Sequence, residues 1–309
     1  MTDILLSTYN GEKFLREFIA SLKNQSCRDF RLLVRDDGSA DGTARLLGEC
    51  LADGAVEARF SASSGRHLGV VGSFGELLAE SRADRLFFAD QDDLWHPGKV
   101  AAMLSMMDDA EARLGRDTPI LLHTDLRVCD EHGKIVADSF VRRQKLSPRR
   151  NGIADLLVQN HVTGCAMMIN GALKDRIRLP FTPHAICHDW YLGLLAAAFG
   201  RIVYASEPYV DYRVHAANVY GAPEYSAGEC AALFKSGRKT LKRRLELTQA
   251  QARDFLAQYG EALPPEARRS VAAWGSIGEL RKWRRVARCL KFGFRKSTPA
   301  RTLGMWWAI

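Results

Sequence analysis

The sequence lacks the cysteine spacing, the long apolar runs and the leader that mark several classes of protein. Its seven cysteines are odd in number and no two stand at CxxC spacing, so we expect neither a disulfide framework nor a zinc site. Reduced thiols in the cytoplasm are the simpler expectation. No apolar run is long enough to span a bilayer. Ile4-Leu5-Leu6 follows the first residues without a basic stretch or a cleavage site, which argues against a secretory signal.

Glycine-rich phosphate loops are also missing near the first apolar segment. No GxGxxG follows Ile4 to Ser7, which disfavours a dinucleotide-dependent oxidoreductase. The segment from Thr8 to Lys13 holds a single glycine, whereas a nucleotidyltransferase normally carries a Gly-rich, basic loop at that position. A nucleotidyltransferase is therefore the second-ranked reading among the enzyme classes considered.

The chain of 309 residues has a formal net charge of +8, and this charge is unevenly spread. No acidic residue follows Glu279. Apolar side chains such as Trp283 and Leu290 are interleaved with Lys and Arg in this region, a pattern that favours an anionic membrane surface as partner. A helical appendage that packs on the rest of the chain is the alternative. Nucleic acid is not expected, because no binding motif surrounds the charges. The basic residues of this region are Arg281, Lys282, Arg284, Arg285, Arg288, Lys291, Arg295, Lys296 and Arg301.

Short apolar segments alternate with helical patterns through the first part of the chain. This alternation is typical of an α/β fold with a mostly parallel sheet flanked by helices, whose ligand lies beyond the carboxyl ends of the strands. Asp36 and Asp90 stand at such ends, and Ser39 or Asp41 is expected to cap the helix that runs towards Cys50. Strands are predicted at 4–7, 30–34, 56–60, 86–89 and 120–122, and helices at 14–22, 71–78 and after Pro97.

The pattern changes after Asn151. A strand is predicted at 162–169, interrupted by Gly164, and a helix opens at His188. Pro208 is expected to separate two further strands, because proline cannot donate a ladder hydrogen bond. From about residue 228 the chain is predicted to be helical and basic.

The acidic run from Asp90 to Asp93 is the first candidate for chemistry. Carboxylates this close repel one another, and a divalent cation relieves that cost. Mg²⁺ and Mn²⁺ prefer oxygen ligands and commonly bridge carboxylates to phosphates. A solvated acidic turn with a helix cap is the alternative reading.

Thr8-Tyr9-Asn10 and the turn that starts at Asp36 follow neighbouring predicted strands. Asp36 can accept a hydrogen bond from a base N–H, and Tyr9 can pack on the base. Ordinary turn chemistry is the alternative, and it is the preferred explanation for Gly38 and Ser39.

Asp189 and His215 are the later candidates. A carboxylate at the opening of a helix can serve as a general base, with a helix cap as the alternative. His215 is a candidate metal or phosphate ligand, although a lone histidine is more often structural.

The ordered motifs STYNGEKFL, VRDDGSADGT, FADQDDLWHPGKV, VTGCAMMIN, HDWYLGLLA and YRVHAANVYG resemble those of family-2 glycosyltransferases of the GT-A fold, in particular the rhamnosyltransferase-like bacterial branch. The resemblance covers about Asp3 to Gly221. It implies a GT-A domain at 1–225, a basic helical extension at 226–309, and an inverting transfer from a nucleotide sugar.

The resemblance also implies site roles. Asp92 binds a divalent metal (Mg²⁺ or Mn²⁺) with help from His215, Asp90 contacts the ribose or a metal-bound water, and Asp189 is the catalytic base. Relatives often carry Asn where this chain has Ser73, which puts contacts of that stretch in question. The nucleoside pocket is assigned to Thr8, Tyr9, Asn10, Glu12 and Asp36, and the sugar and acceptor side to Trp95, Gly164, Cys165 and Trp190.

These assignments predict a cytoplasmic enzyme, peripheral on the inner face of the membrane, that acts in cell-surface polysaccharide or O-antigen synthesis. Its donor is a dTDP- or UDP-sugar, with L-rhamnose as the branch's example, and its acceptor is a saccharide or lipid-linked saccharide. A non-catalytic nucleotide-sugar-binding or membrane-scaffold protein that keeps the fold is the alternative from another class.

Overall fold

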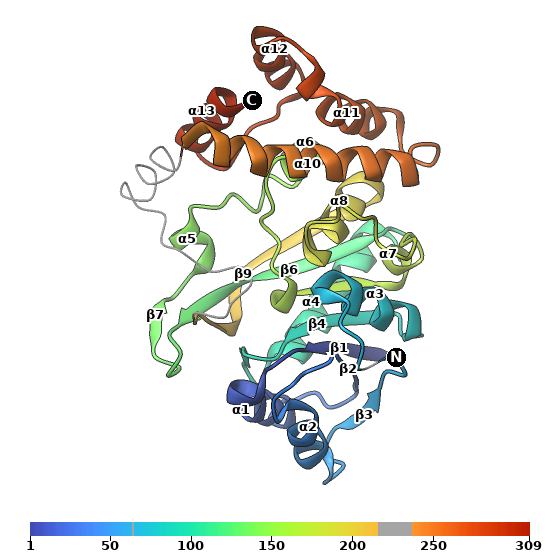
Figure 1. The fold of residues 1–309 in the computed structure, drawn as a ribbon. Coiled ribbons are helices and arrows are strands. Elements are labelled where there is room, and N and C mark those ends of the chain that lie inside the picture. The colour runs from blue at the N-terminus through green and yellow to red at the C-terminus, as the bar shows by residue number, and fades with distance from the viewer. Residues whose placement is uncertain (64, 216–236) are drawn as a thin grey trace.

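The chain folds around one mixed β-sheet, with helices on both faces and a helical layer at one end (Figure 1). A computed structural model describes residues 1–63, 65–215 and 237–309. The sheet has the order β3-β2-β1-β4-β8-β6-β9-β5, and β7 pairs with β6. The strands are β1 (Thr2–Thr8), β2 (Arg31–Asp36), β3 (Glu57–Phe60), β4 (Arg85–Asp90), β5 (Leu94–Trp95), β6 (Ile120–Cys129), β7 (Ile135–Ala137), β8 (Met167–Asn170) and β9 (Arg201–Arg213).

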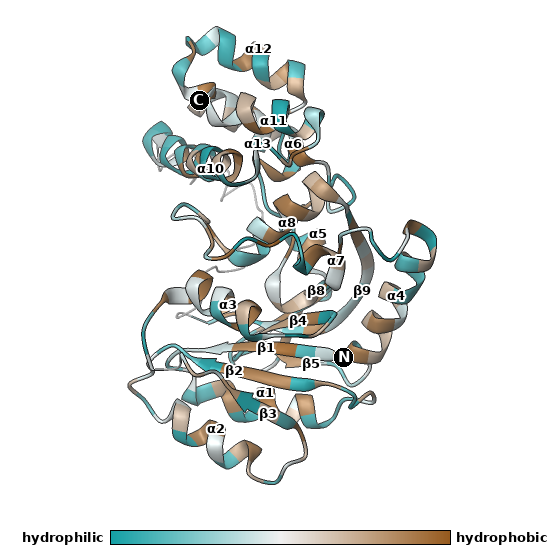
Figure 2. Cartoon of the chain, turned by 90° about the vertical axis from the view of Figure 1, so that its right-hand side faces the viewer, coloured by the Kyte–Doolittle hydropathy of each residue, from teal (hydrophilic) through white to brown (hydrophobic). Residues whose placement is uncertain are grey.

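The first half of the sheet follows the sequence prediction. Strands β3, β2, β1 and β4 are parallel and joined by helices whose apolar residues recur at helical spacing. In α1, Leu15, Phe18 and Leu22 are buried and lie in one hydrophobic cluster with residues of β1 and β2, whose apolar stretches are brown in Figure 2. The helices of this half are α1 (Glu12–Lys23), α2 (Thr43–Leu51), α3 (Gly69–Glu80) and α4 (Lys99–Leu114).

The second half departs from the predicted strands in two places. The expected strand at 162–169 starts instead as the 3-10 turn η1 (Gly164–Ala166), and only β8 is extended, antiparallel to β4 and β6. The two strands expected around Pro208 form one strand, β9. The register against β6 shifts at Thr124 and Asp125, where Pro208 pairs, so an irregularity of the ladder absorbs the missing N–H.

The predicted cap of α2 is also corrected. The N-cap residue is Gly42, and neither Ser39 nor Asp41 occupies that position. Asp41 still contributes, because its carboxylate accepts a hydrogen bond from the backbone N–H of Thr43 at 3.0 Å.

The C-terminal helices share a hydrophobic core with the sheet. Trp274 and Phe255 are fully buried and lie in one cluster with Tyr191 and Leu194 of α8 (His188–Phe199). The predicted boundary at 225/226 lies outside the described residues. No helix in the described ranges is both long and apolar enough to cross a membrane. The remaining helices are α5 (Phe140–Gln144), α6 (Ile153–Leu156), α7 (Gly171–Lys174), α10 (Gly237–Tyr259), α11 (Pro265–Gly275), η2 (Ile277–Glu279), α12 (Lys282–Phe292) and α13 (Pro299–Ala308).

Candidate active site

The carboxyl ends of three parallel strands bring the predicted polar residues to one edge of the sheet. Thr8 at the end of β1 is in register with Asp36 at the end of β2, and Ser7 is in register with Asp90 at the end of β4. Since neighbouring strands lie about 4.8 Å apart, these residues lie close together at one edge of the sheet.

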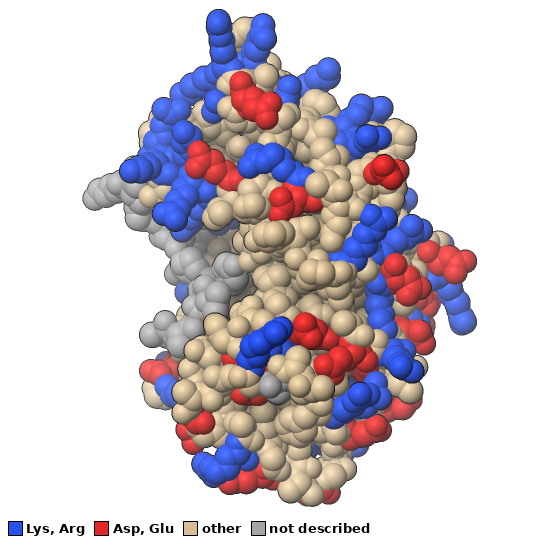
Figure 3. Space-filling view, turned by 45° about the vertical axis from the view of Figure 1, so that its right-hand side comes forward, with Lys and Arg blue, Asp and Glu red and all other residues tan. Residues whose placement is uncertain are grey.

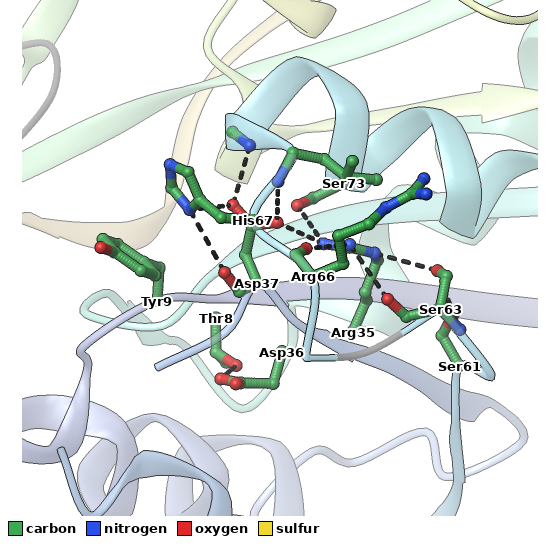
Figure 4. A network of polar contacts seen from close by, with 12 residues as sticks. Thr8, Tyr9, Arg35, Asp36, Asp37, Ser61, Ser63, Arg66, His67 and Ser73 are labelled. Carbon is green, nitrogen blue, oxygen red and sulfur yellow. Dashed lines mark hydrogen bonds and ion pairs between the residues drawn. The ribbon is translucent and has the colours of Figure 1, made fainter. Parts of the chain in front are cut away.

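Asp36 is held in place by its neighbours at this edge. Its carboxylate accepts hydrogen bonds from the Thr8 hydroxyl at 2.8 Å and from the Ser39 hydroxyl at 2.7 Å. Tyr9 projects beside it with 47% of its surface exposed, and its ring centroid lies 4.7 Å from that of His67 (Figure 4). A fixed carboxylate beside an exposed aromatic surface suits a nucleobase.

The side chains of Asn10 and Glu12 accept hydrogen bonds from the backbone of the turn that follows β2. Asn10 has a left-handed backbone, with φ of 47°, and its side-chain oxygen accepts from the backbone N–H of Ala40 at 2.9 Å. The Glu12 carboxylate accepts from the N–H of Gly42 at 3.0 Å. Both residues therefore shape the turn after β2, and direct contact with a nucleoside stays a prediction for them.

Gln91 joins the first strand's loop to the acidic loop. Its side-chain oxygen accepts from the backbone N–H of Tyr9, and its amide donates to the Tyr9 carbonyl, both at 2.9 Å. The amide packs so closely on Gly11 that a β-carbon there would lie 2.0 Å from the Gln91 oxygen. Glycine is thus required at Gly11 for this contact.

A buried network around Asp37 was missed by the sequence analysis. Asp37 accepts from the Arg35 guanidinium at 2.6 Å and from the backbone N–H groups of Leu68 and Gly69, so it anchors the start of α3 (Figure 4). Burial raises the pKa of Asp37 but these hydrogen bonds outweigh it, and the net shift is downward. Ser73 is buried here and accepts from Arg35 at 2.7 Å, so it belongs to this network.

The acidic loop after β4 gathers charge at the same edge. The Asp92 carboxylate lies 2.7 Å from Nε2 of His215, which joins residues 123 positions apart. Burial, followed by the charges of Asp92 and Asp189, raises the pKa of Asp90 to about 7. The charges of Asp92 and Asp189 therefore both act on Asp90, which indicates that the three carboxylates lie in one region of the molecule.

The acidic loop carries donor atoms of the kind that a hard divalent cation prefers. Asp90 and Asp92 offer carboxylate oxygens and His215 offers a ring nitrogen, while the excess negative charge around Asp90 favours a cation. Among the described residues, the three side chains whose ligand atoms all lie within 4.8 Å of one another are instead those of Asp90, Asp93 and Cys165. That second group suits the cation less well, because Asp93 and Cys165 are buried and burial raises the pKa of the thiol well above its usual range.

Asp189 lies in the first turn of α8 and is fixed by three donors. The backbone N–H of Gly164 donates to one carboxylate oxygen at 3.1 Å, and the Asn160 amide and the Trp190 N–H donate to the other. The N-cap residue of α8 is Cys187, so Asp189 is not the cap. Burial raises the pKa of Asp189 against these hydrogen bonds, which places its ionisation closer to neutral pH.

Two residues assigned to the acceptor side, Trp95 and Cys165, are buried. Trp95 is 3% exposed and packs on Phe18 and Phe87, so its predicted place on the sugar and acceptor side is wrong. Burial of its large ring in the core beneath the acidic loop is the physical reason. The Cys165 thiol is likewise buried. Trp190 donates its indole N–H to the carbonyl of Leu156, which leaves its acceptor contact a prediction.

Lys99 is the main residue of the site that the sequence did not reveal. Its side chain is fully buried beneath the acidic loop, and its ammonium donates to the carbonyl of Cys165. The ammonium lies 3.1 Å from the centroid of the Trp95 ring, and carboxylate charges of Asp93 and Asp90 act on it. Lys99 therefore connects the acidic loop to the turn whose Gly164 N–H orients Asp189.

Replacing Lys99 by Met should lower turnover by about 10- to 100-fold, because the Cys165 carbonyl and the carboxylates of Asp90 and Asp93 lose the ammonium that acts on them. The control is Lys174→Met, which removes a partly buried ammonium bonded to the carbonyls of Ser81 and Ala83. Steady-state kinetics and thermal melting of both variants check the prediction. Equal losses of activity in the two variants would show that Lys99 acts only through stability.

Comparison with known proteins places this site in a family. The family model for glycosyl transferase family 2 matches residues 3–175, more than half of the chain. An uncharacterised glycosyltransferase of Nostoc sp. is 23% identical over 265 residues, which cover 83% of this chain and 76% of that protein. One of Rickettsia typhi is 21% identical over 83% of this chain and 78% of its own length. Three mycobacterial relatives are matched over 60% of their length.

Solved structures show the same fold at low sequence identity. Staphylococcus aureus TarS in complex with UDP-GlcNAc has a TM-score of 0.55 and 14% identity, covering 99% of this chain and 89% of that chain. Mannosyltransferase PcManGT of Pyrobaculum calidifontis, in complex with GDP-Man and Mn²⁺, has a TM-score of 0.54 and 14% identity, covering 98% and 77%. The predicted GT-A fold is confirmed, and the chain belongs to glycosyl transferase family 2.

Proposed function

We propose that the protein transfers a sugar, with inversion, from a nucleoside diphosphate to an acceptor hydroxyl. The observation that carries the proposal is Asp189, held by the Asn160 amide and by the N–H groups of Gly164 and Trp190, at the edge where Asp90 and Asp92 lie. A fixed carboxylate facing a cluster of carboxylates suits a base opposite a diphosphate-metal site.

The residues divide the reaction between them. Asp189 accepts the proton of the acceptor hydroxyl as that oxygen attacks the anomeric carbon from the face opposite the leaving group. The N–H groups that bind its carboxylate keep it oriented and favour its ionised form. Asp92, His215 and Asp90 would hold Mg²⁺ or Mn²⁺, which supplies positive charge to the departing diphosphate.

The nucleoside side supports a nucleotide-sugar donor. Asp36 has a fixed carboxylate for a base N–H, and Tyr9 offers a half-exposed ring for the base. Structural neighbours are solved with UDP-GlcNAc and with GDP-Man. We propose a dTDP- or UDP-sugar, with L-rhamnose as the sugar suggested by the family branch.

Thermal melting with nucleotides tests the donor class. A nucleoside diphosphate present at about 100 times its Kd, together with Mn²⁺, should raise Tm by about 5 °C. Neither the nucleotide nor the metal alone should give the full shift, because each completes the binding site of the other. A shift with every nucleotide and no metal would contradict the proposal. Release of pyrophosphate from a nucleoside triphosphate would instead indicate a nucleotidyltransferase.

The acceptor is proposed to be a saccharide or a lipid-linked saccharide used for cell-surface polysaccharide such as O-antigen. This assignment places the protein in the cytoplasm, on the inner face of an anionic membrane. The basic residues after Glu279 support that location.

A further inference from the structure

Helix α12 has two different faces. On one side Cys289 is 1% exposed, and Val286 and Phe292 are partly buried with it. On the other side Trp283 and Leu290 are each 64% exposed, although both are large and apolar. They stand seven residues apart, with exposed Ala287 between them, and so form one stripe along the helix. An exposed apolar stripe of this kind usually marks an interaction surface.

A groove runs beside this stripe, between α11 and α12. It has a volume of about 580 Å³, and cations line it on the side of α12. Arg288 is fixed across the groove, because its guanidinium donates to the Ser276 hydroxyl at 3.0 Å and to the Ala273 carbonyl at 3.3 Å. The groove is lined by Ala272, Ala273, Ser276, Leu280, Arg284, Ala287, Arg288, Lys291 and Phe292.

The charge of this surface has one sign. Arg284, Arg288 and Lys291 recur at intervals of four and three residues, so they project on one side of α12. None of them forms an ion pair with another described residue. Figure 3 shows blue side chains gathered at the end of the molecule that carries the C-terminal helices. The groove therefore offers cations over an apolar floor, without a carboxylate among its lining residues.

We propose that this face of α12 docks the protein on an anionic lipid bilayer. The groove receives lipid phosphate groups through Arg284 and Lys291, and Trp283 and Leu290 enter the interface between headgroups and acyl chains. Apolar residues at an interfacial helix bury into that boundary while Lys and Arg remain at the level of the headgroups. The inference identifies the surface for the membrane partner in the proposed function, and it rests on that part of the proposal.

The exposed leucine and tryptophan favour a bilayer over nucleic acid. Backbone recognition of nucleic acid needs cations and, for single strands, aromatic stacking, and it gives no role to an aliphatic side chain such as Leu290. A bilayer accommodates both apolar residues and the surrounding cations.

Sedimentation of the full chain with vesicles tests the surface. Vesicles of phosphatidylcholine with added phosphatidylglycerol should bind the protein, and vesicles of phosphatidylcholine alone should bind it at least about tenfold more weakly. Arg284→Gln with Lys291→Gln should reduce binding to anionic vesicles by about tenfold or more. At high salt the electrostatic attraction is screened, and the remaining vesicle binding depends on burial of apolar side chains. Trp283→Ala with Leu290→Ala should therefore reduce vesicle binding measured at high salt.

The matched control is Arg268→Gln with Arg269→Gln, two exposed cations on α11 outside the groove. An equal loss of vesicle binding in this control and in the Arg284→Gln, Lys291→Gln variant would refute the proposed docking surface. Tighter binding of an RNA duplex than of anionic vesicles would also refute it. All variants should keep the thermal midpoint and turn over a soluble acceptor as the parent does. Transferase activity is measured in a separate assay. If the unmodified protein showed no transferase activity, the proposed function would be refuted, but the result of the vesicle experiment would not change.

Discussion

Asp189→Asn should lower kcat by about 10²–10⁴-fold, because the amide cannot accept the acceptor's proton. The single amide oxygen can still accept the hydrogen bonds that Trp190 and Asn160 donate to one carboxylate oxygen, while the bond from the Gly164 N–H to the other oxygen is lost. Nucleotide binding should be unchanged, since no assigned nucleoside contact involves Asp189. Turnover and nucleotide-induced thermal shifts, measured on the same preparation, check both parts.

Asp175→Asn provides the control, because it changes a carboxylate just after α7, outside the site. Near-full transfer by Asp189→Asn would show that another group takes the proton. The pH profile adds an independent reading. Burial raises the pKa of Asp189, so kcat/KM should fall as pH drops through a value above that of an ordinary aspartate. An acidic limb below pH of about 4 would contradict this role.

Asp92→Ala should remove activity together with its dependence on metal. A bound cation stabilises the charge of a leaving diphosphate by several kcal/mol, so turnover should fall by about 10³-fold at any Mn²⁺ concentration. The substitution also removes the partner of His215 at 2.7 Å. Titration of Mn²⁺ against turnover is the measurement.

Asp108→Ala is the control for this experiment, since Asp108 is an exposed carboxylate on α4 that pairs with Arg85. It should leave the metal titration unchanged. Metal-stimulated turnover of normal size in Asp92→Ala would refute the ligand assignment and would leave Asp90 and Asp93 as the candidate ligands.

The periodicity of apolar residues in the sequence was sufficient to predict most of the strands and helices in the first half of the sheet. Phe14, Phe18 and Leu22 recur at helical spacing, and the structure buries them on one face of α1. The sequence predicts Asp36 and Asp90 at the ends of strands, and the parallel register confirms that they end β2 and β4, which flank β1 in one sheet. Such features depend on residues close in sequence, because helical and strand periods repeat within one element.

Tertiary contacts decided the rest. Lys99 and Trp95 read as ordinary helix and strand residues until the fold buries them under the acidic loop, where Lys99 bonds to a carbonyl 66 positions away. The mixed sheet arises because β8 pairs antiparallel with both β4 and β6. In α12, packing against the other C-terminal elements determines that Cys289 is covered while Trp283 and Leu290 face outward.

The sequence alone thus determined which segments form the first strands and helices and which carboxylates end them. The tertiary structure decided which of those groups meet, which are buried, and which face of the C-terminal helices stays open. The physical reason is that periodicity and turn chemistry act over a few residues, whereas burial, charge pairing and sheet order are set by segments far apart in the chain.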